Sequence, residues 1–158
     1  MKPDAVIIAA RGKLAENGEV QAYFEKMKVP FCGSGSEETR FALNKFDCYE
    51  VFRMEGLPTL RPYLLNSVKQ ANDDVLEKLA RVFGFPCIVK PNKSYGGKGI
   101  YKVEAMSELK NCIGLAFKTD NQVLIEPHIS EGVEVTSCIR YKWFLNHKIF
   151  RLPAQSMT

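Results

Sequence analysis

The sequence has no apolar run that approaches the roughly 20 residues needed to cross a bilayer. The apolar run near the N-terminus covers only residues 5–10 and is followed by Arg11 and Lys13, which excludes the layout of a secretory signal peptide. Charge of one sign is not concentrated either, since the net charge is +4 and the basic residues are spread along the chain. We therefore expect no membrane and no nucleic-acid partner.

Histidine and paired cysteines are also scarce. The chain has five cysteines, an odd number with no Cys-x-x-Cys pair, and only two histidines, His128 and His147. No histidine has a ligand-like spacing from a cysteine, so no metal site is predicted, and we expect reduced, largely buried thiols in a cytoplasmic protein. Because no acid lies at catalytic spacing from His128, we expect a packed residue there rather than a general base. The sequence identifies no catalytic residue.

The composition that remains is that of a packed protein. Hydrophobic residues make up 46% and charged residues 25% of the chain, which is enough apolar material for a core and excludes general disorder. A length of 158 residues allows one full domain, or a small lobe joined to a larger one.

The chain divides into two segments. Residues 1–35 read as strand, helix and strand, with a strand buried on both faces at residues 5–10 and a helix from Gly18 to Lys28. This is the pattern of a βαβ unit, which needs neighbouring strands on its sheet. We therefore expect residues 1–35 to be the remnant of a larger N-terminal α/β lobe, and residues 36–158 to form a second subdomain.

The second segment mixes helices and strands in one subdomain. Apolar periodicity, caps and Gly or Pro breakers predict its elements. The helices are predicted at residues 36–55, 66–83 and 107–118, and the strands at 85–90, 100–103 and 122–126. Lys45 falls in the middle of the first predicted helix, where the alternative interpretation is an exposed helical lysine.

A Gly-rich turn at residues 92–99 joins two of these strands. Glycines let backbone N–H groups approach phosphate oxygens, and Lys90, Lys93 and Lys98 supply compensating charge, so the turn is typical of a polyphosphate clamp. The alternative is a mobile hairpin loop with solvated lysines. The Walker spacing and its following helix are both missing.

About thirty residues later, an apolar strand leads into a segment that holds Glu126, Ile129 and Glu134. A carboxylate at a strand end can accept a hydrogen bond from an amino group on a base or from ribose hydroxyls. The alternative is a pair of exposed acids at a sheet edge.

Together these features resemble the nucleotide-binding core of the ATP-grasp superfamily. They are a lysine that ends a strand before a Gly-rich hairpin, a helix, and a strand with the pattern Glu-x-x-Ile-x-x-Gly-x-Glu at residues 126–134. Within the superfamily the chain is most similar to D-alanine–D-alanine ligases, through three further stretches at residues 2–21, 29–35 and 44–59. The fold class implied is α/β (α+β), with an ATP-grasp nucleotide-binding lobe preceded by the partial βαβ lobe.

The resemblance implies a role for individual residues. Lys45 and Lys90 would hold the ATP phosphates, and a flexible loop would close over them. Glu126 would face the adenine amino group, Ile129 would line the base pocket, and Glu134 would bind the ribose hydroxyls. The loop residues implied are Ser94, Gly96, Gly97 and Lys98.

The resemblance also implies an activity and partners. Family members phosphorylate a carboxylate with ATP and let an amine attack the acyl phosphate, with Mg²⁺ bound by a C-terminal catalytic lobe that has no match in this sequence. The expected ligands are thus ATP or ADP and, in the intact enzyme, a small amino acid, and a homodimer or a complementing C-terminal fragment remains open. We expect turnover by this chain alone to be absent.

Two other functions remain open. The pair Gly96-Gly97 replaces the serines usual in the family, Arg11 replaces a histidine, and Pro127 replaces a basic residue. These departures leave open an ATP-grasp ligase for another amino acid or carboxylate. The missing lobe leaves open a non-catalytic nucleotide-binding or interaction module.

Overall fold

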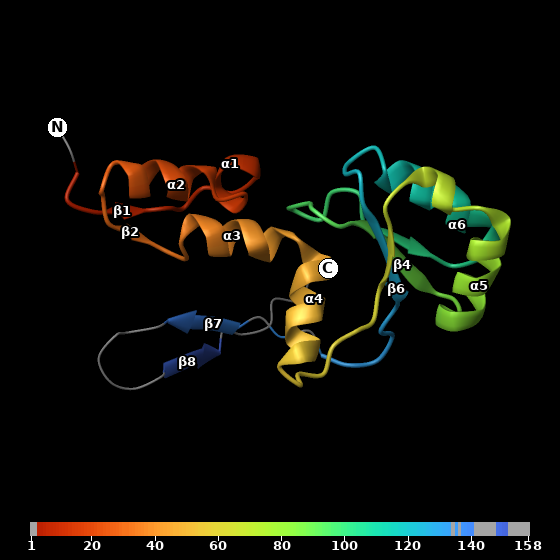
Figure 1. Cartoon of the computed structure of the whole chain (residues 1–158). Helices are drawn as coiled ribbons and strands as arrows, with labels where there is room; N and C mark the ends of the chain where they lie inside the picture. The colour runs from red at the N-terminus through yellow and green to blue at the C-terminus, as the bar shows by residue number, and fades with distance from the viewer. Residues whose placement is uncertain (1–2, 134, 136, 141–147, 152–158) are drawn as a thin grey trace. The chain divides into compact units, whose positions relative to one another are not determined.

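The computed structural model of the chain describes residues 3–133, 135, 137–140 and 148–151 (Figure 1). It divides into two compact units, Met1–His128 and Ile129–Thr158. The first contains, in order, β1 (Val6–Ile7), α1 (Lys13–Glu16), α2 (Glu19–Lys26), β2 (Phe31–Cys32), α3 (Ser36–Leu43), α4 (Lys45–Met54), β3 (Tyr63–Leu65), the 3₁₀ helix η1 (Val68–Gln70), α5 (Asp73–Phe83), β4 (Cys87–Pro91), β5 (Tyr101–Val103), α6 (Met106–Ala116) and β6 (Val123–Pro127). The second contains β7 (Ser137–Arg140) and β8 (Lys148–Arg151). The predicted boundary at residue 35 stays a prediction.

The N-terminal strand, helix and strand form as predicted, but the first strand is short and exposed. β1 pairs in parallel with β2, so the βαβ connection is confirmed. The predicted burial on both faces is wrong in this structure, because Ile7 is 83% exposed. The physical reason is that, within the described residues, β1 has β2 as its only paired strand, and a strand needs neighbours and covering helices to be buried on both sides.

The helix predicted at residues 36–55 is in fact two helices. Asn44 has φ −82° and ψ 95°, an extended conformation that ends α3 and begins α4. Its side chain caps α4 by accepting a hydrogen bond from the Asp47 N–H, and its backbone forms an isolated antiparallel bridge with Lys93. Lys45 is therefore the first residue of α4 rather than a mid-helix residue.

The helix predicted to begin at Asn66 or Ser67 starts later. Residues 68–70 form the 3₁₀ helix, and Asn72 caps α5 by accepting a hydrogen bond from the Val75 N–H at 2.9 Å. Gly84, with φ 67°, ends α5 as predicted. The later helix is confirmed as α6 and the strands as β4, β5 and β6, with boundaries shifted by one to two residues.

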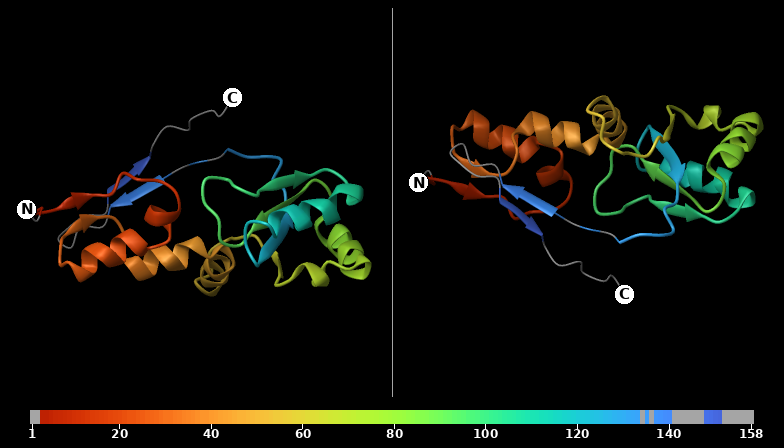
Figure 2. Two further views of the ribbon diagram at one scale, coloured as in Figure 1. Left: turned by 90° about the horizontal axis from the view of Figure 1, so that it is seen from above. Right: turned by 90° about the horizontal axis from the view of Figure 1, so that it is seen from below.

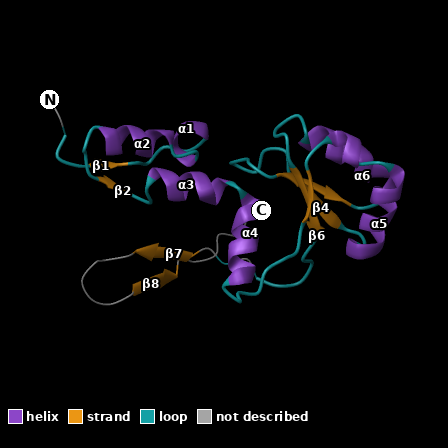
Figure 3. Cartoon of the chain, viewed as in Figure 1, coloured by secondary structure: helices purple, strands orange, loops and turns teal. Residues whose placement is uncertain are grey.

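A four-stranded antiparallel sheet in the order β3-β6-β4-β5 forms the centre of the first unit. α5 and α6 pack beside each other on one face of the sheet, as both views of Figure 2 show. The core lies between this face and the two helices, and includes the fully buried residues Leu65, Val89, Val103, Ile113 and Ile125. Figure 3 shows the sheet between the α5–α6 pair and α4.

The cysteines are less buried than the sequence suggested. Cys87 is buried in the core, and burial raises the pKa of its thiol to about 11. Cys48 and Cys112 are only half-buried and Cys32 is exposed, so the prediction of largely buried thiols is wrong for these three. All four thiols are free.

The second unit, as far as it is described, is an antiparallel hairpin in which Ser137 pairs with Arg151 and Arg140 with Lys148. None of the helices in the described part of the chain has the length and apolar content of a membrane span.

Candidate functional site

The pleat of the central sheet places two predicted site residues on the same face. Cys87 and Val89 of β4 point into the core beneath α5 and α6, so Lys90 points to the opposite face. On β6, Ile125 belongs to the core and Glu126 therefore also points away from it. Because Lys90 lies opposite Leu124 in the β4–β6 register, Lys90 and Glu126 are diagonal neighbours on this face.

Lys90 and Glu126 form a buried ion pair there. The Nζ of Lys90 lies 2.6 Å from Oε1 of Glu126, and their side chains are only 12% and 8% exposed. Burial acts to lower the pKa of Lys90, but its hydrogen bonds to Glu126 and Tyr49 outweigh this effect and raise the pKa above the ordinary lysine value. The structure thus holds the Lys90 ammonium against the Glu126 carboxyl group on the face of the sheet opposite the core.

Lys45 lies at the N-terminus of α4 and is bound by neutral oxygens only. Its Nζ donates to the carbonyl oxygen of Asn92 at 3.2 Å, and to the carbonyl and hydroxyl oxygens of Ser94 at 3.0 and 3.3 Å. Burial and the nearby positive charge of Lys90 lower the pKa of Lys45. Within the described residues Lys45 has no ion pair, so this corner of the site carries a partly buried positive charge that an anion would neutralise.

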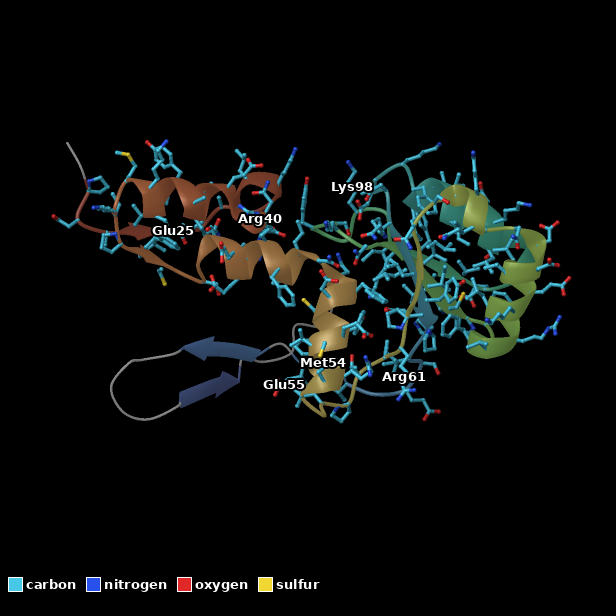
Figure 4. The ribbon with its side chains drawn as sticks, viewed as in Figure 1. Glu25, Arg40, Met54, Glu55, Arg61 and Lys98 are labelled. Carbon is cyan, nitrogen blue, oxygen red and sulfur yellow. The ribbon has the colours of Figure 1, made fainter. Side chains whose placement is uncertain are left out.

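The turn beside Lys45 exposes backbone donors. Gly96 and Gly97 have φ of 61° and 71°, which glycine adopts without strain. Among the described residues, the N–H groups of Gly96 and Gly97 have no hydrogen-bond acceptor. Lys98 is exposed and extends from the turn away from the sheet (Figure 4). Free N–H groups and an exposed lysine are suited to binding phosphate oxygens.

A cavity of about 330 Å³ lies beside Lys45, at the low end of the size of small-molecule pockets. It is bounded by α1, α3, the start of α4 and the Gly-rich turn, and is lined by Ala15, Glu16, Thr39, Ala42, Leu43, Lys45 and Ser94.

The sequence did not single out Asn92, which is 1% exposed and links three elements. Its amide nitrogen donates to Asn44 at 2.8 Å and to Gln122 at 2.9 Å, and its amide oxygen accepts from the Phe46 N–H at 2.9 Å. Asn92 therefore fixes the start of α4, and with it Lys45, against the ends of β4 and β6. A buried asparagine directly after a strand could have been recognised only from the fold.

Tyr49 was also missed. It lies four residues after Lys45 on α4, so the two side chains share a helix face, and that spacing was the available signal. Its hydroxyl donates to Oε2 of Glu126 at 2.9 Å and accepts from Lys90 at 3.0 Å. The ammonium of Lys90 also lies 5.4 Å from the centre of the Tyr49 ring.

The structure does not test the roles of three other residues named from the sequence. Ile129 begins the second unit and is 66% exposed, and Glu134 lies outside the described residues. His128 ends the first unit, where its N–H donates to the Pro86 carbonyl at 3.3 Å. Its side-chain Nδ1 is buried without a partner among the described residues. The roles predicted for these residues stay predictions.

The described residues contain no group of three His, Cys, Asp or Glu side chains that could hold a metal ion. The cluster itself is suited to recognition of a ligand. It offers two neighbouring ammonium groups and free backbone N–H donors to a polyanion, and a carboxylate to an amino group.

Comparison with known proteins identifies the family of the chain. A family model described as the D-ala D-ala ligase C-terminus matches residues 51–144, which is more than half of the 158 residues. The D-alanine–D-alanine ligase of Flavobacterium johnsoniae is 35% identical over 140 residues, covering 88% of this chain and 42% of that relative.

Solved structures of D-alanine–D-alanine ligases are also similar to the chain. The D-alanine–D-alanine ligase of Bacillus anthracis complexed with ATP is 32% identical, with a TM-score of 0.70 over 85% of this chain and 43% of that one. The ligase of Coxiella burnetii has a TM-score of 0.82 over 94% of this chain at 21% identity, a likeness that shows the fold alone. The predicted fold class is confirmed, and the chain spans about 42% of the length of the first relative.

Proposed function

Because the chain belongs to the D-alanine–D-alanine ligase family, we propose that it supplies the ATP-binding part of a carboxylate–amine ligase that makes a peptidoglycan precursor. The observation that carries the proposal is the cluster formed by Lys45, Lys90 and Glu126 beneath the Gly-rich turn. An ATP-complexed relative of the same fold supports it.

In this proposal the two lysines bind the phosphates. Lys45 exchanges its neutral oxygen partners for a phosphate oxygen, and Lys90 turns from Glu126 toward the same polyanion. The exchange at Lys45 is favourable because an anionic oxygen replaces neutral acceptors, whereas Lys90 exchanges one anionic partner for another. Ser94, Gly96, Gly97 and Lys98 close over the phosphates with their backbone N–H groups, the Ser94 hydroxyl and the Lys98 ammonium.

The base and ribose take the other end of the site. Glu126 accepts a hydrogen bond from the adenine amino group, since its carboxylate is held at the end of β6 on the face of the sheet next to α4. Ile129 would supply an apolar contact to the base and Glu134 would accept from the ribose hydroxyls, both by analogy with the family pattern.

The reaction proposed for the whole enzyme is transfer of the ATP γ-phosphoryl group to a carboxylate, followed by attack of an amine on the acyl phosphate. The residues of this chain bind and orient the nucleotide and offset the charge of its phosphates. Mg²⁺ is expected in the family enzyme, but the described residues hold no ligand set that fits it.

A ligase for a different amino acid or carboxylate is the second candidate. Gly96-Gly97 stands where the family usually has serines, one of which orients substrate, so a hydroxyl contact to the substrate is replaced by backbone alone. The amino acid that stimulates ATP-dependent phosphate release by the full-length enzyme distinguishes the two. D-alanine stimulation supports the first, and stimulation only by another amino acid supports the second.

The binding proposal is tested by titrating the chain with ADP in a calorimeter. Lys45→Met and Lys90→Gln are each expected to weaken ADP binding about 10- to 100-fold, because a charge-assisted hydrogen bond to phosphate is worth about 1.5 to 3 kcal/mol. The amide of Lys90→Gln can still donate to Glu126, which protects the fold.

Lys110→Ala is the matched control. Lys110 lies on α6, which packs on the face of the sheet opposite Lys90, and it is 65% exposed and pairs with Asp73. Its loss is expected to leave ADP affinity unchanged. If Lys45→Met and Lys90→Gln bind ADP as tightly as Lys110→Ala, the phosphate assignment is wrong.

A further inference from the structure

Tyr49, Lys90 and Glu126 form a closed triangle of hydrogen bonds on the face of the central sheet next to α4. Lys90 donates to Oε1 of Glu126 at 2.6 Å and to the Tyr49 hydroxyl at 3.0 Å, and the hydroxyl donates to Oε2 of Glu126 at 2.9 Å. Each carboxylate oxygen of Glu126 is thus held by a different donor. Tyr49 comes from α4, whereas the other two come from the sheet.

We propose that the Tyr49 hydroxyl positions the Glu126 carboxylate for the adenine amino group, and so sets the preference of the site for adenine over a 6-oxo purine. The inference rests on the proposed nucleotide-binding function. Tyr49 is not itself required to touch the nucleotide, so we call it a positioning residue.

The role follows from what nucleotide binding does to the triangle. Lys90 forms the ion pair with Glu126 and is also a proposed phosphate ligand. Its ammonium cannot keep its full hydrogen bond to Glu126 while it binds the phosphate. When Lys90 turns toward phosphate, Oε1 of Glu126 loses its donor and becomes free to accept from the base. The Tyr49 hydroxyl then remains as the side-chain donor that holds Oε2.

Tyr49 is suited to remain in place during this exchange. It is partly buried on α4, whose first turn is fixed by the Asn44 cap and by the Phe46 N–H to Asn92 bond at 2.9 Å. Burial raises the pKa of Tyr49 above its ordinary value, so its hydroxyl stays protonated and continues to donate at neutral pH. A phenol has few rotatable bonds, so the cost of holding it is small.

Selectivity depends on the orientation of the carboxylate. Adenine carries an amino donor at position 6, whereas hypoxanthine carries an acceptor oxygen there. A carboxylate fixed toward that position accepts a hydrogen bond from the adenine amino group. Against the hypoxanthine oxygen the same carboxylate has no donor, and such a mismatch gives strong discrimination between the two ligands. A carboxylate free to rotate would turn away from the oxygen and discriminate less.

The test compares ADP with inosine diphosphate by calorimetry on the chain and on Tyr49→Phe. We expect Tyr49→Phe to weaken ADP binding about fivefold while inosine diphosphate binding changes little, so that the ratio of the two affinities falls about fivefold. A merely structural loss would weaken both nucleotides equally. An unchanged ratio would overturn the proposal.

Two further variants make the result specific. Tyr101→Phe removes a hydroxyl from β5 that has no hydrogen bond among the described residues, and is expected to leave both affinities unchanged. In a Glu126→Gln background, Tyr49→Phe is expected to have no further effect on the affinity ratio. A full fivefold effect in that background would show that Tyr49 acts by another route.

The outcomes separate this inference from the proposed function. If the chain binds ADP and Lys90→Gln weakens it, but Tyr49→Phe leaves the affinity ratio intact, only the role of Tyr49 is wrong. If the chain does not bind ADP, both proposals are wrong.

Discussion

Glu126→Ala is expected to lower the free energy of unfolding by about 3 kcal/mol, because removing one partner of a buried ion pair leaves the other charge uncompensated. Lys90 is only 12% exposed, and its remaining side-chain acceptor among the described residues is the Tyr49 hydroxyl. Urea unfolding of the two proteins, followed by circular dichroism, gives the difference.

Two controls identify the cause of this loss. The double variant Lys90→Met with Glu126→Leu replaces the pair by apolar side chains and is expected to recover most of the stability. Glu77→Ala breaks the exposed ion pair with Arg81, in which the side chains are 61% and 78% exposed, and is expected to change stability by less than about 1 kcal/mol. A double variant as unstable as Glu126→Ala would contradict the uncompensated charge.

The pH dependence of the pair has a definite sign. The pKa of Lys90 is raised in the folded chain, so its protonated form is stabilised by folding. The contribution is therefore fully present below the ordinary lysine pKa of 10.5 and is lost as pH rises through the higher folded value. At neutral pH the ion pair contributes in full.

Asn92→Leu is expected to lower the free energy of unfolding by a similar amount, about 3 kcal/mol. The substitution keeps the number and branching of the side-chain heavy atoms. It leaves the Phe46 N–H, the Asn44 side chain and the Gln122 side chain without the Asn92 partner, and each buried unpaired group costs about 1 to 3 kcal/mol. Water can reach the less buried of these groups, so the total loss of stability is smaller than the sum of the largest individual costs.

The expected signature of Asn92→Leu is local as well as global. Because Asn92 fixes the α3–α4 junction, limited proteolysis is expected to cut near Asn44 sooner in the variant. Asn121→Leu, at an exposed position on the nearby loop, is the matched control and is expected to be neutral. Equal stability of the two variants would show that the Asn92 network does not hold the junction.

The sequence predicted the elements around the site well, because their signals are local. Apolar periodicity located α2 and α6, and short apolar runs located β4 and β6. Neither run alternates apolar with polar residues, so the sequence did not show which face of the sheet Lys90 and Glu126 take. The ion pair itself needed the antiparallel register, which no local signal gives.

The break at Asn44 could not be predicted from propensity. The residues on both sides favour helix, and the extended conformation is stabilised by the bridge to Lys93 and the hydrogen bond from Asn92, both nearly 50 positions away. Tertiary contacts therefore overrode the local preference. The consequence for the site is direct, because Lys45 starts a helix whose N-terminus favours anions instead of lying along its side.

The measurement that tests the central claim most directly is amide hydrogen exchange of the chain with and without saturating ADP. The account predicts that exchange slows about tenfold across residues 93–100, because the free N–H groups of Gly96 and Gly97 become bound to phosphate, while α5 is unchanged. Lys90→Gln should need more ADP to reach the same slowing. Unchanged exchange across residues 93–100 in saturating ADP would contradict the claim that this turn, with Lys45 and Lys90, binds the nucleotide.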